Sequence, residues 1–138
     1  MSKILPSLLL LFLLAAGCTP HETRHVDDES LVMRCQSFPC GDEMKTQDMD
    51  LIYEFQLDPS GECLLRGTAT PKGVPVNRSV DFIVLSVDLL RDVTVADSLS
   101  FPLPCKGPAR PISFEKKFTP SGGFDGVAFH WDVKLLDD

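Results

Sequence analysis

Soft sulfur ligands are concentrated in one short stretch of this sequence. Between residues 33 and 49 there are two cysteines and three methionines: Met33, Cys35, Cys40, Met44 and Met49. Two histidines, His21 and His25, lie upstream. Thiolate and thioether sulfurs select Cu(I), so one interpretation is a copper site in an envelope metal-binding protein. The interpretation that we favour is a disulfide with packing methionines, because oxidised cysteines cannot ligate and the methionine spacing follows no known motif.

The residues needed for nucleophilic catalysis are sparse. The third histidine, His130, shares one face of an alternating stretch with Asp132 and Lys134. No Gly-x-Ser-x-Gly, His-Glu-x-x-His or Cys-x-x-Cys motif is present. We interpret the His130 face as a solvated surface, and we predict no enzymatic activity, no cofactor and no metal.

The N-terminal residues have the order of a secretory leader. Lys3 is followed by an apolar run, Leu8–Leu14, that is too short to span a bilayer. The motif Ala15-Ala16-Gly17-Cys18 resembles the lipobox of bacterial lipoproteins, with alanine where leucine is commonest. The resemblance implies cleavage before Cys18 and attachment of a diacylglycerol to its thiol.

The lipobox resemblance divides the chain into three parts. Residues 1–17 would be the signal peptide, residues 18–30 a lipidated, flexible tether, and residues 31–138 one folded domain. Thr19 stands where an aspartate often favours retention in the inner membrane. We therefore expect a protein of the bacterial cell envelope, anchored in the outer membrane by its N-terminal lipid and facing the periplasm.

The charge of the chain excludes one class of partner. Removal of residues 1–17, which contain Lys3 and no acidic residue, leaves a formal net charge of 13 − 1 − 20 = −8. Nucleic acids and anionic lipids require clustered lysines and arginines. We expect no nucleic-acid binding.

The four remaining cysteines predict disulfides. An even number of cysteines in an exported chain typically pairs, and four cysteines allow three connectivities. We predict Cys35–Cys40, which would close a small loop around Pro39, and Cys63–Cys105, which would join a strand to a loop about 40 residues further on.

The hydrophobic pattern after the leader has a period of two and no helical stripe. Residues 51–57 and 63–69 alternate around the turn Asp58–Gly61 and predict a hairpin. Residues 80–90 are apolar on both faces, which is typical of a central strand, whereas the prolines of residues 101–111 exclude one. Residues 127–135 alternate strictly and predict a half-buried strand. Residues 31–50 fit either a short strand or a helical turn.

These strands predict an all-β fold. We expect a small antiparallel β-sandwich, immunoglobulin-like in architecture, with a small β-barrel as the alternative. The strand rhythm resembles that of small immunoglobulin-like or transthyretin-like domains of bacterial envelope proteins, without a diagnostic motif. We expect the aromatic residues to lie in the core. The alternative is that a subset of them is exposed and forms a protein-binding patch. The function that we expect is a lipid-anchored envelope protein whose sandwich binds another envelope protein or has a structural role.

Overall fold

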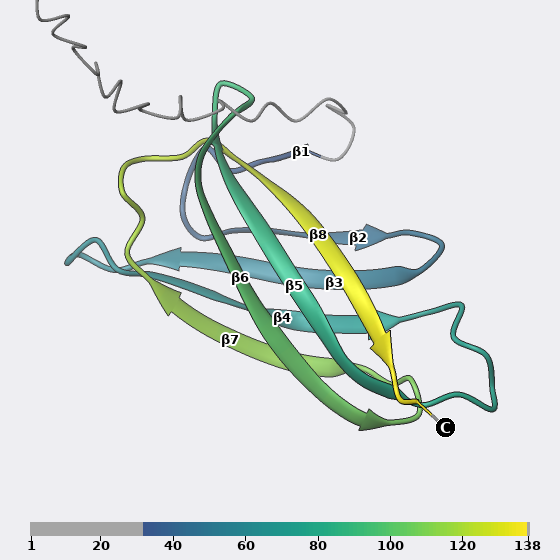
Figure 1. Ribbon diagram of the computed structural model, residues 1–138. Coiled ribbons are helices and arrows are strands. Elements are labelled where there is room, and N and C mark those ends of the chain that lie inside the picture. Colours follow the sequence, from purple (N-terminus) through teal and green to yellow (C-terminus); the bar gives the residue numbers. More distant parts are fainter. Residues whose placement is uncertain (1–31, 138) are drawn as a thin grey trace, which may run out of the picture.

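The computed structural model describes residues 32–137 and shows eight β-strands in two packed sheets (Figure 1). The signal peptide, Cys18 and the tether lie outside the described residues. The strands are β1 (Val32–Arg34), β2 (Cys40–Lys45), β3 (Met49–Leu57), β4 (Cys63–Pro71), β5 (Val80–Arg91), β6 (Thr94–Gly107), β7 (Ile112–Phe118) and β8 (Gly126–Leu135).

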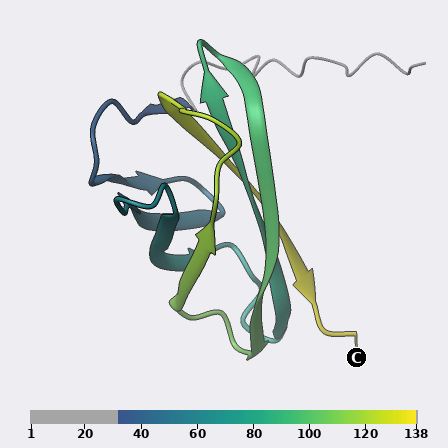
Figure 2. The ribbon, with the colours of Figure 1, turned by 90° about the vertical axis from the view of Figure 1, so that its left-hand side faces the viewer.

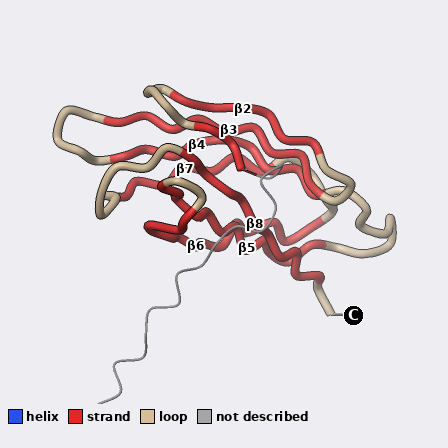
Figure 3. Tube along the Cα trace, turned by 90° about the horizontal axis from the view of Figure 1, so that it is seen from above, coloured by secondary structure: helices blue, strands red, loops and turns tan. Residues whose placement is uncertain are grey.

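Each sheet has four antiparallel strands, and the two sheets face each other across the core (Figures 2 and 3). The first sheet has the order β1-β8-β5-β6 and the second has the order β2-β3-β4-β7. The prediction of an all-β sandwich is confirmed, and the barrel alternative is wrong because the sheets do not close on each other. In immunoglobulin constant domains the first strand pairs with the second, whereas here β1 pairs with the last strand, so the likeness is one of architecture.

The strands with the clearest alternation form as predicted. In β8, Val127 and Phe129 are buried and His130 is exposed. The predicted hairpin is β3–β4, and β5 is central because it pairs with both β6 and β8. The proline-rich stretch continues β6, which is an edge strand of the first sheet. In the stretch predicted as a short strand or a helical turn, the described residues 32–50 form β1, β2 and the start of β3.

Aromatic rings fill the space between the sheets, as expected. Phe55 is fully buried and packs against the ring of Phe129 with centroids 6.4 Å apart, while Tyr53 lies 4.5 Å from the same ring. Phe82 is the exception, because it is half-buried and does not pack against the core between the sheets. A register shift between Val80 and Phe82 changes the parity of β5, which places Phe82 on the outer face of the sheet, beside Lys134.

One of the two predicted disulfides is present. Cys35 follows β1 and Cys40 begins β2, and the bond between them links the two sheets where the chain crosses from one to the other. The prediction of Cys35–Cys40 is confirmed.

The predicted Cys63–Cys105 disulfide is wrong, because both cysteines are buried free thiols. Along β4, Cys63 lies opposite Phe118 at the end of β7, whereas Ile112 at the start of β7 lies opposite Ala69. Cys105 precedes Ile112 and therefore lies near that other end of the sandwich. The offset is about 20 Å at 3.3 Å per strand residue, far beyond the Cα separation of a disulfide.

Among residues 32–137, no helix has the length and apolar character needed to cross a membrane.

Candidate functional site

The last strand, β8, has one edge that is only partly covered (yellow in Figure 1). Its other edge pairs with β5 along the whole strand. On the partly covered edge, the described residues of β1 pair with Gly126–Ala128. Within the part of the chain that the structure describes, no strand lies next to residues 129–135 on this side. Among residues 32–137, no strand pairs with their backbone N–H and C=O groups on this side, so these groups can pair with an added strand.

A groove of about 300 Å³ runs beside this uncovered edge. One wall is formed by three half-buried side chains of β8: Trp131, Val133 and Leu135. The opposite wall is formed by Asp48 and the loop of residues 72–75. We call this feature the β8 groove. It combines an open strand edge with apolar side chains, which are the two elements that strand addition requires.

The wall opposite β8 is held in place by hydrogen bonds. The indole Nε1 of Trp131 donates to Asp48 Oδ2 at 3.2 Å, and the Thr46 hydroxyl donates to Asp48 Oδ1 at 3.0 Å. Both hydrogen bonds lower the pKa of the Asp48 carboxyl, and the bond from Trp131 has the larger effect. The backbone N–H of Lys72 donates to the carbonyl of Asp48 at 2.9 Å, and its ammonium pairs with Asp50 at 2.8 Å. The groove is therefore built from linked elements of both sheets.

The outer face of the first sheet carries a polar cluster around a buried carboxylate. Asp88 of β5 is only 3% exposed, and its Oδ2 lies 2.9 Å from Nε2 of His130. The Ser98 hydroxyl donates to Asp88 Oδ1. Beside them, the hydroxyls of Ser86 and Ser100 lie 2.9 Å apart. The prediction that His130 is simply a solvated side chain is thus incomplete, because its imidazole is the partner of a buried acid.

The cluster has the residue types of a hydrolase triad but a different connectivity. In a Ser-His-Asp triad the serine contacts the imidazole and the aspartate orients it. Here the hydroxyl of Ser98 contacts the carboxylate of Asp88 instead of the imidazole of His130. The arrangement satisfies the buried charge of Asp88, and we assign it a structural role. Sequence reasoning missed Asp88, although an acid inside the apolar run of residues 80–90 was the signal that could have found it.

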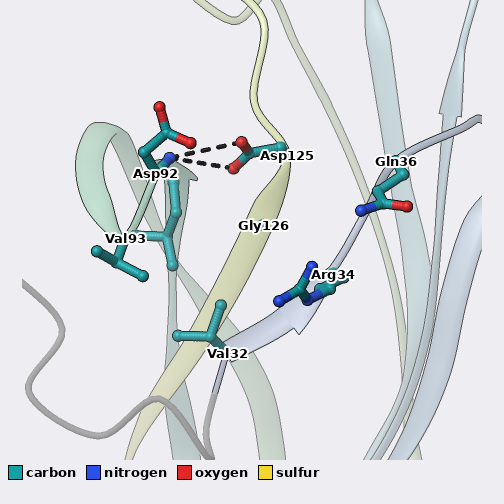
Figure 4. A pocket seen from close by; sticks show the side chains of 8 residues that line it. Val32, Arg34, Gln36, Asp92, Val93, Asp125 and Gly126 are labelled. Atoms are coloured by element: carbon teal, nitrogen blue, oxygen red, sulfur yellow. Dashed lines mark hydrogen bonds between the residues drawn. The ribbon is translucent and has the colours of Figure 1, made fainter.

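A second hollow, of about 280 Å³, lies where β1 meets the start of β8 (Figure 4). Its polar groups are Arg34, Gln36, Asp92 and Asp125. The backbone N–H of Asp92 donates to the carboxylate of Asp125 at 3.3 Å. This contact ties the β5–β6 turn to the segment before β8, so the hollow is in part a structural junction.

The sulfur-rich stretch is dispersed by the fold. Cys35 and Cys40 are oxidised, Met49 is fully buried, and Met33 and Met44 pack against the core. His21 and His25 lie outside the described residues. Among residues 32–137 no group of three or more His, Cys, Asp or Glu side chains could hold a metal. The described residues therefore offer no assembled donor set for the copper alternative, and we do not carry it forward.

Fold and site together define a β-sandwich with an open, apolar strand edge. The chain matches no protein-family model, and comparisons with curated proteins and with solved structures found no match.

Proposed function

We propose that this chain is a lipid-anchored protein of the bacterial cell envelope whose sandwich binds protein by strand addition at β8. Cys18 would carry the lipid, and the domain would face the periplasm from the outer membrane. The single observation that carries the binding role is the uncovered edge of residues 129–135 beside the β8 groove.

The geometry supports strand addition for two reasons. An incoming strand would satisfy the free backbone groups of β8, which supplies affinity, and its alternate side chains would enter the groove beside Trp131 and Val133, which supplies specificity. Soluble proteins usually protect such edges with inward-pointing charges or prolines. Residues 129–135 contain no proline, and three of the residues that line the groove, Trp131, Val133 and Leu135, are apolar.

The binding role can be tested by photo-crosslinking in intact cell envelopes. A photoreactive amino acid would replace Lys134, which is exposed on β8. We expect it to crosslink to protein, and we expect the additional substitution Val133→Lys to abolish this crosslink, because a charge in the groove opposes strand addition. Ile52→Lys is the matched control, since Ile52 is 54% exposed on the other sheet. Crosslinking that Val133→Lys leaves unchanged would contradict the proposal.

The anchor is tested separately by Cys18→Ser. We expect the variant to lose its diacylglycerol and to be misprocessed or released from the membrane, because the thiol is the acceptor of the lipid. Metabolic labelling with a fatty acid and fractionation of the envelope measure both effects. A variant that is still acylated and still bound to the membrane would refute the assignment of Cys18.

A further inference from the structure

We infer that the strand which adds to β8 is β8 of a second copy, so that two sandwiches form a two-fold dimer in which their first sheets join into one continuous sheet. The inference rests on the proposed function and names the partner of the same edge. Antiparallel pairing of β8 with its equivalent gives the order β6-β5-β8-β8-β5-β6, which is six strands wide. Each β1 stays beside the start of its own β8.

The exposed charges of β8 are self-complementary in one register. Asp132 and Lys134 are both exposed and point to the outer face of the sheet. If the two-fold axis passes through Val133, each Asp132 lies directly opposite Lys134 of the second copy. The dimer then contains two opposite-charge pairs, and directly opposed pairs of this kind stabilise an antiparallel ladder.

The same register also matches the apolar side chains. Val133 lies opposite its own equivalent, and Trp131 lies opposite Leu135 of the second copy. All three side chains are half-buried and face the groove in the single copy. Pairing would complete their burial, which supplies the hydrophobic part of the interaction.

The neighbouring registers are disfavoured by charge. An axis through Asp132 would place that carboxylate opposite its own equivalent and would place His130 opposite Lys134. An axis through Lys134 would oppose two ammonium groups. Like charges that face each other across a ladder are destabilising. An axis through Trp131 would require pairing at Ala128, where β1 is already bound.

The chain's own N-terminal segment is a poor occupant of the edge. The register of β1 on β8, continued toward the N-terminus, would put Glu29 opposite Trp131 and Asp27 opposite Val133. Both carboxylates would then face the apolar groove. Burial of an unpaired charge is costly, so this sequence does not favour extension of β1.

The dimer is compatible with two anchors in one membrane. The two copies run in opposite directions, and the starts of their β8 strands are about 46 Å apart, at 3.3 Å per residue. Residues 18–31 precede β1 in each copy, and a chain of that length spans up to about 50 Å when extended. Each Cys18 can therefore reach the same bilayer.

Exchange of the charges at Asp132 and Lys134 tests the dimer. The mature lipidated protein is reconstituted in nanodiscs, and its self-association is measured. Asp132→Lys would place lysines opposite each other, and Lys134→Asp would place aspartates opposite each other. We expect each variant to weaken self-association roughly tenfold or more, since two attractive pairs become repulsive. We expect a mixture of the two variants to form a heterodimer, and the double variant to regain the wild-type affinity. Sedimentation velocity and native mass spectrometry measure these states.

The register has an independent readout. Val133→Cys should form a disulfide with its equivalent in a second copy upon oxidation in the envelope, because directly opposed residues lie within disulfide distance. Ile52→Cys, which lies on the other sheet, should not. The native thiols do not compete, because Cys63 and Cys105 are buried.

The outcomes separate this inference from the proposed function. A monomeric wild type, or self-association that charge exchange does not change, overturns the dimer. The photoreactive residue at position 134 could then crosslink to a different protein, and Val133→Lys could abolish that crosslink. In that case strand addition at β8 is supported, and only the identity of the partner is wrong. Absence of both the dimer and the groove-dependent crosslink overturns both proposals.

Discussion

At the scale of single residues, the pairing of Asp88 with His130 shows what a sequence conceals. The two residues are 42 positions apart, and they meet only because β5 and β8 are neighbours in the first sheet. The alternation of residues 127–135 places His130 on the outer face, but it does not reveal which strand lies beside it. Likewise, the even number of cysteines suggests pairing, whereas only the register of β4 and β7 shows that Cys63 and Cys105 lie far apart.

The contact with His130 should contribute to stability. His130→Ala would leave the buried Asp88 carboxylate with only the Ser98 hydroxyl, and loss of a partner to a buried charged group costs about 1–3 kcal/mol. Urea unfolding followed by circular dichroism measures the change. Lys45→Ala removes an exposed ion pair with Glu43 and should change the free energy of unfolding by less than about 0.5 kcal/mol. Equal effects of the two substitutions would show that the Asp88 contact is unimportant.

The buried thiol of Cys63 predicts a loss of stability at alkaline pH. Burial raises the pKa of Cys63 from its ordinary value of 9.0 to about 11. Between these values the unfolded chain loses the thiol proton while the folded chain keeps it, so stability falls as pH rises from about 9 to about 11. We expect Cys63→Ala to reduce this slope in urea midpoints measured across that range. Burial also raises the pKa of Tyr53, so part of the slope should remain; an unchanged slope would contradict the assignment to Cys63.

At the scale of strands and turns, the predictions from sequence succeed where one face of a strand is buried. The β3–β4 hairpin and β8 alternate clearly, and both form as expected. Two features escape this reasoning. The register shift before Phe82 moves its ring to the outer face, and no residue pattern marks that shift. The uncovered edge of β8 lies beyond the residues that pair with the described part of β1, and three strand residues have too few alternations to predict that pairing.

The β5–β6 turn carries backbone strain that a substitution can relieve. Asp92 and Val93 have φ values of 49° and 59°, and a two-residue hairpin turn with two positive φ values usually contains glycine. A β-branched residue in this region costs about 1–2 kcal/mol. After the entropic cost of glycine, Val93→Gly should stabilise the protein by about 0.5–1 kcal/mol.

The control for Val93→Gly is Val76→Gly in the β4–β5 loop. Val76 is fully exposed and does not have a positive φ, so glycine there should only increase the entropy of the unfolded chain and destabilise. Thermal unfolding of both variants checks the prediction. A lower melting temperature for Val93→Gly would show that the turn is not strained.

At the scale of the whole molecule, the Cys35–Cys40 disulfide fixes the place where the chain crosses from β1 in the first sheet to β2 in the second sheet. The bond closes a loop with a sequence separation of only five residues. The chain-entropy model gives about 2 kcal/mol for so short a loop. We therefore expect the double substitution of Cys35 and Cys40 by alanine to lower the free energy of unfolding by about that amount, as measured in urea.

The thiol content of the mature protein checks the same assignment. Cys63 and Cys105 are free and buried, and Cys35 and Cys40 are bonded. We expect thiol titration of the non-reduced protein to detect two thiols after unfolding and almost none before it. Detection of no thiols after unfolding would restore the pairing of Cys63 with Cys105, and detection of four thiols would contradict the Cys35–Cys40 disulfide.

The position of β8 between β1 and β5 determines when the domain can fold. β8 is an inner strand of the first sheet and is also the most C-terminal of the strands that the structure describes. Until residues 126–135 emerge, β1 has no neighbour and β5 lacks one of its two partners. The first sheet therefore cannot be completed before residues 126–135 are available, whereas all four strands of the second sheet precede them in the sequence.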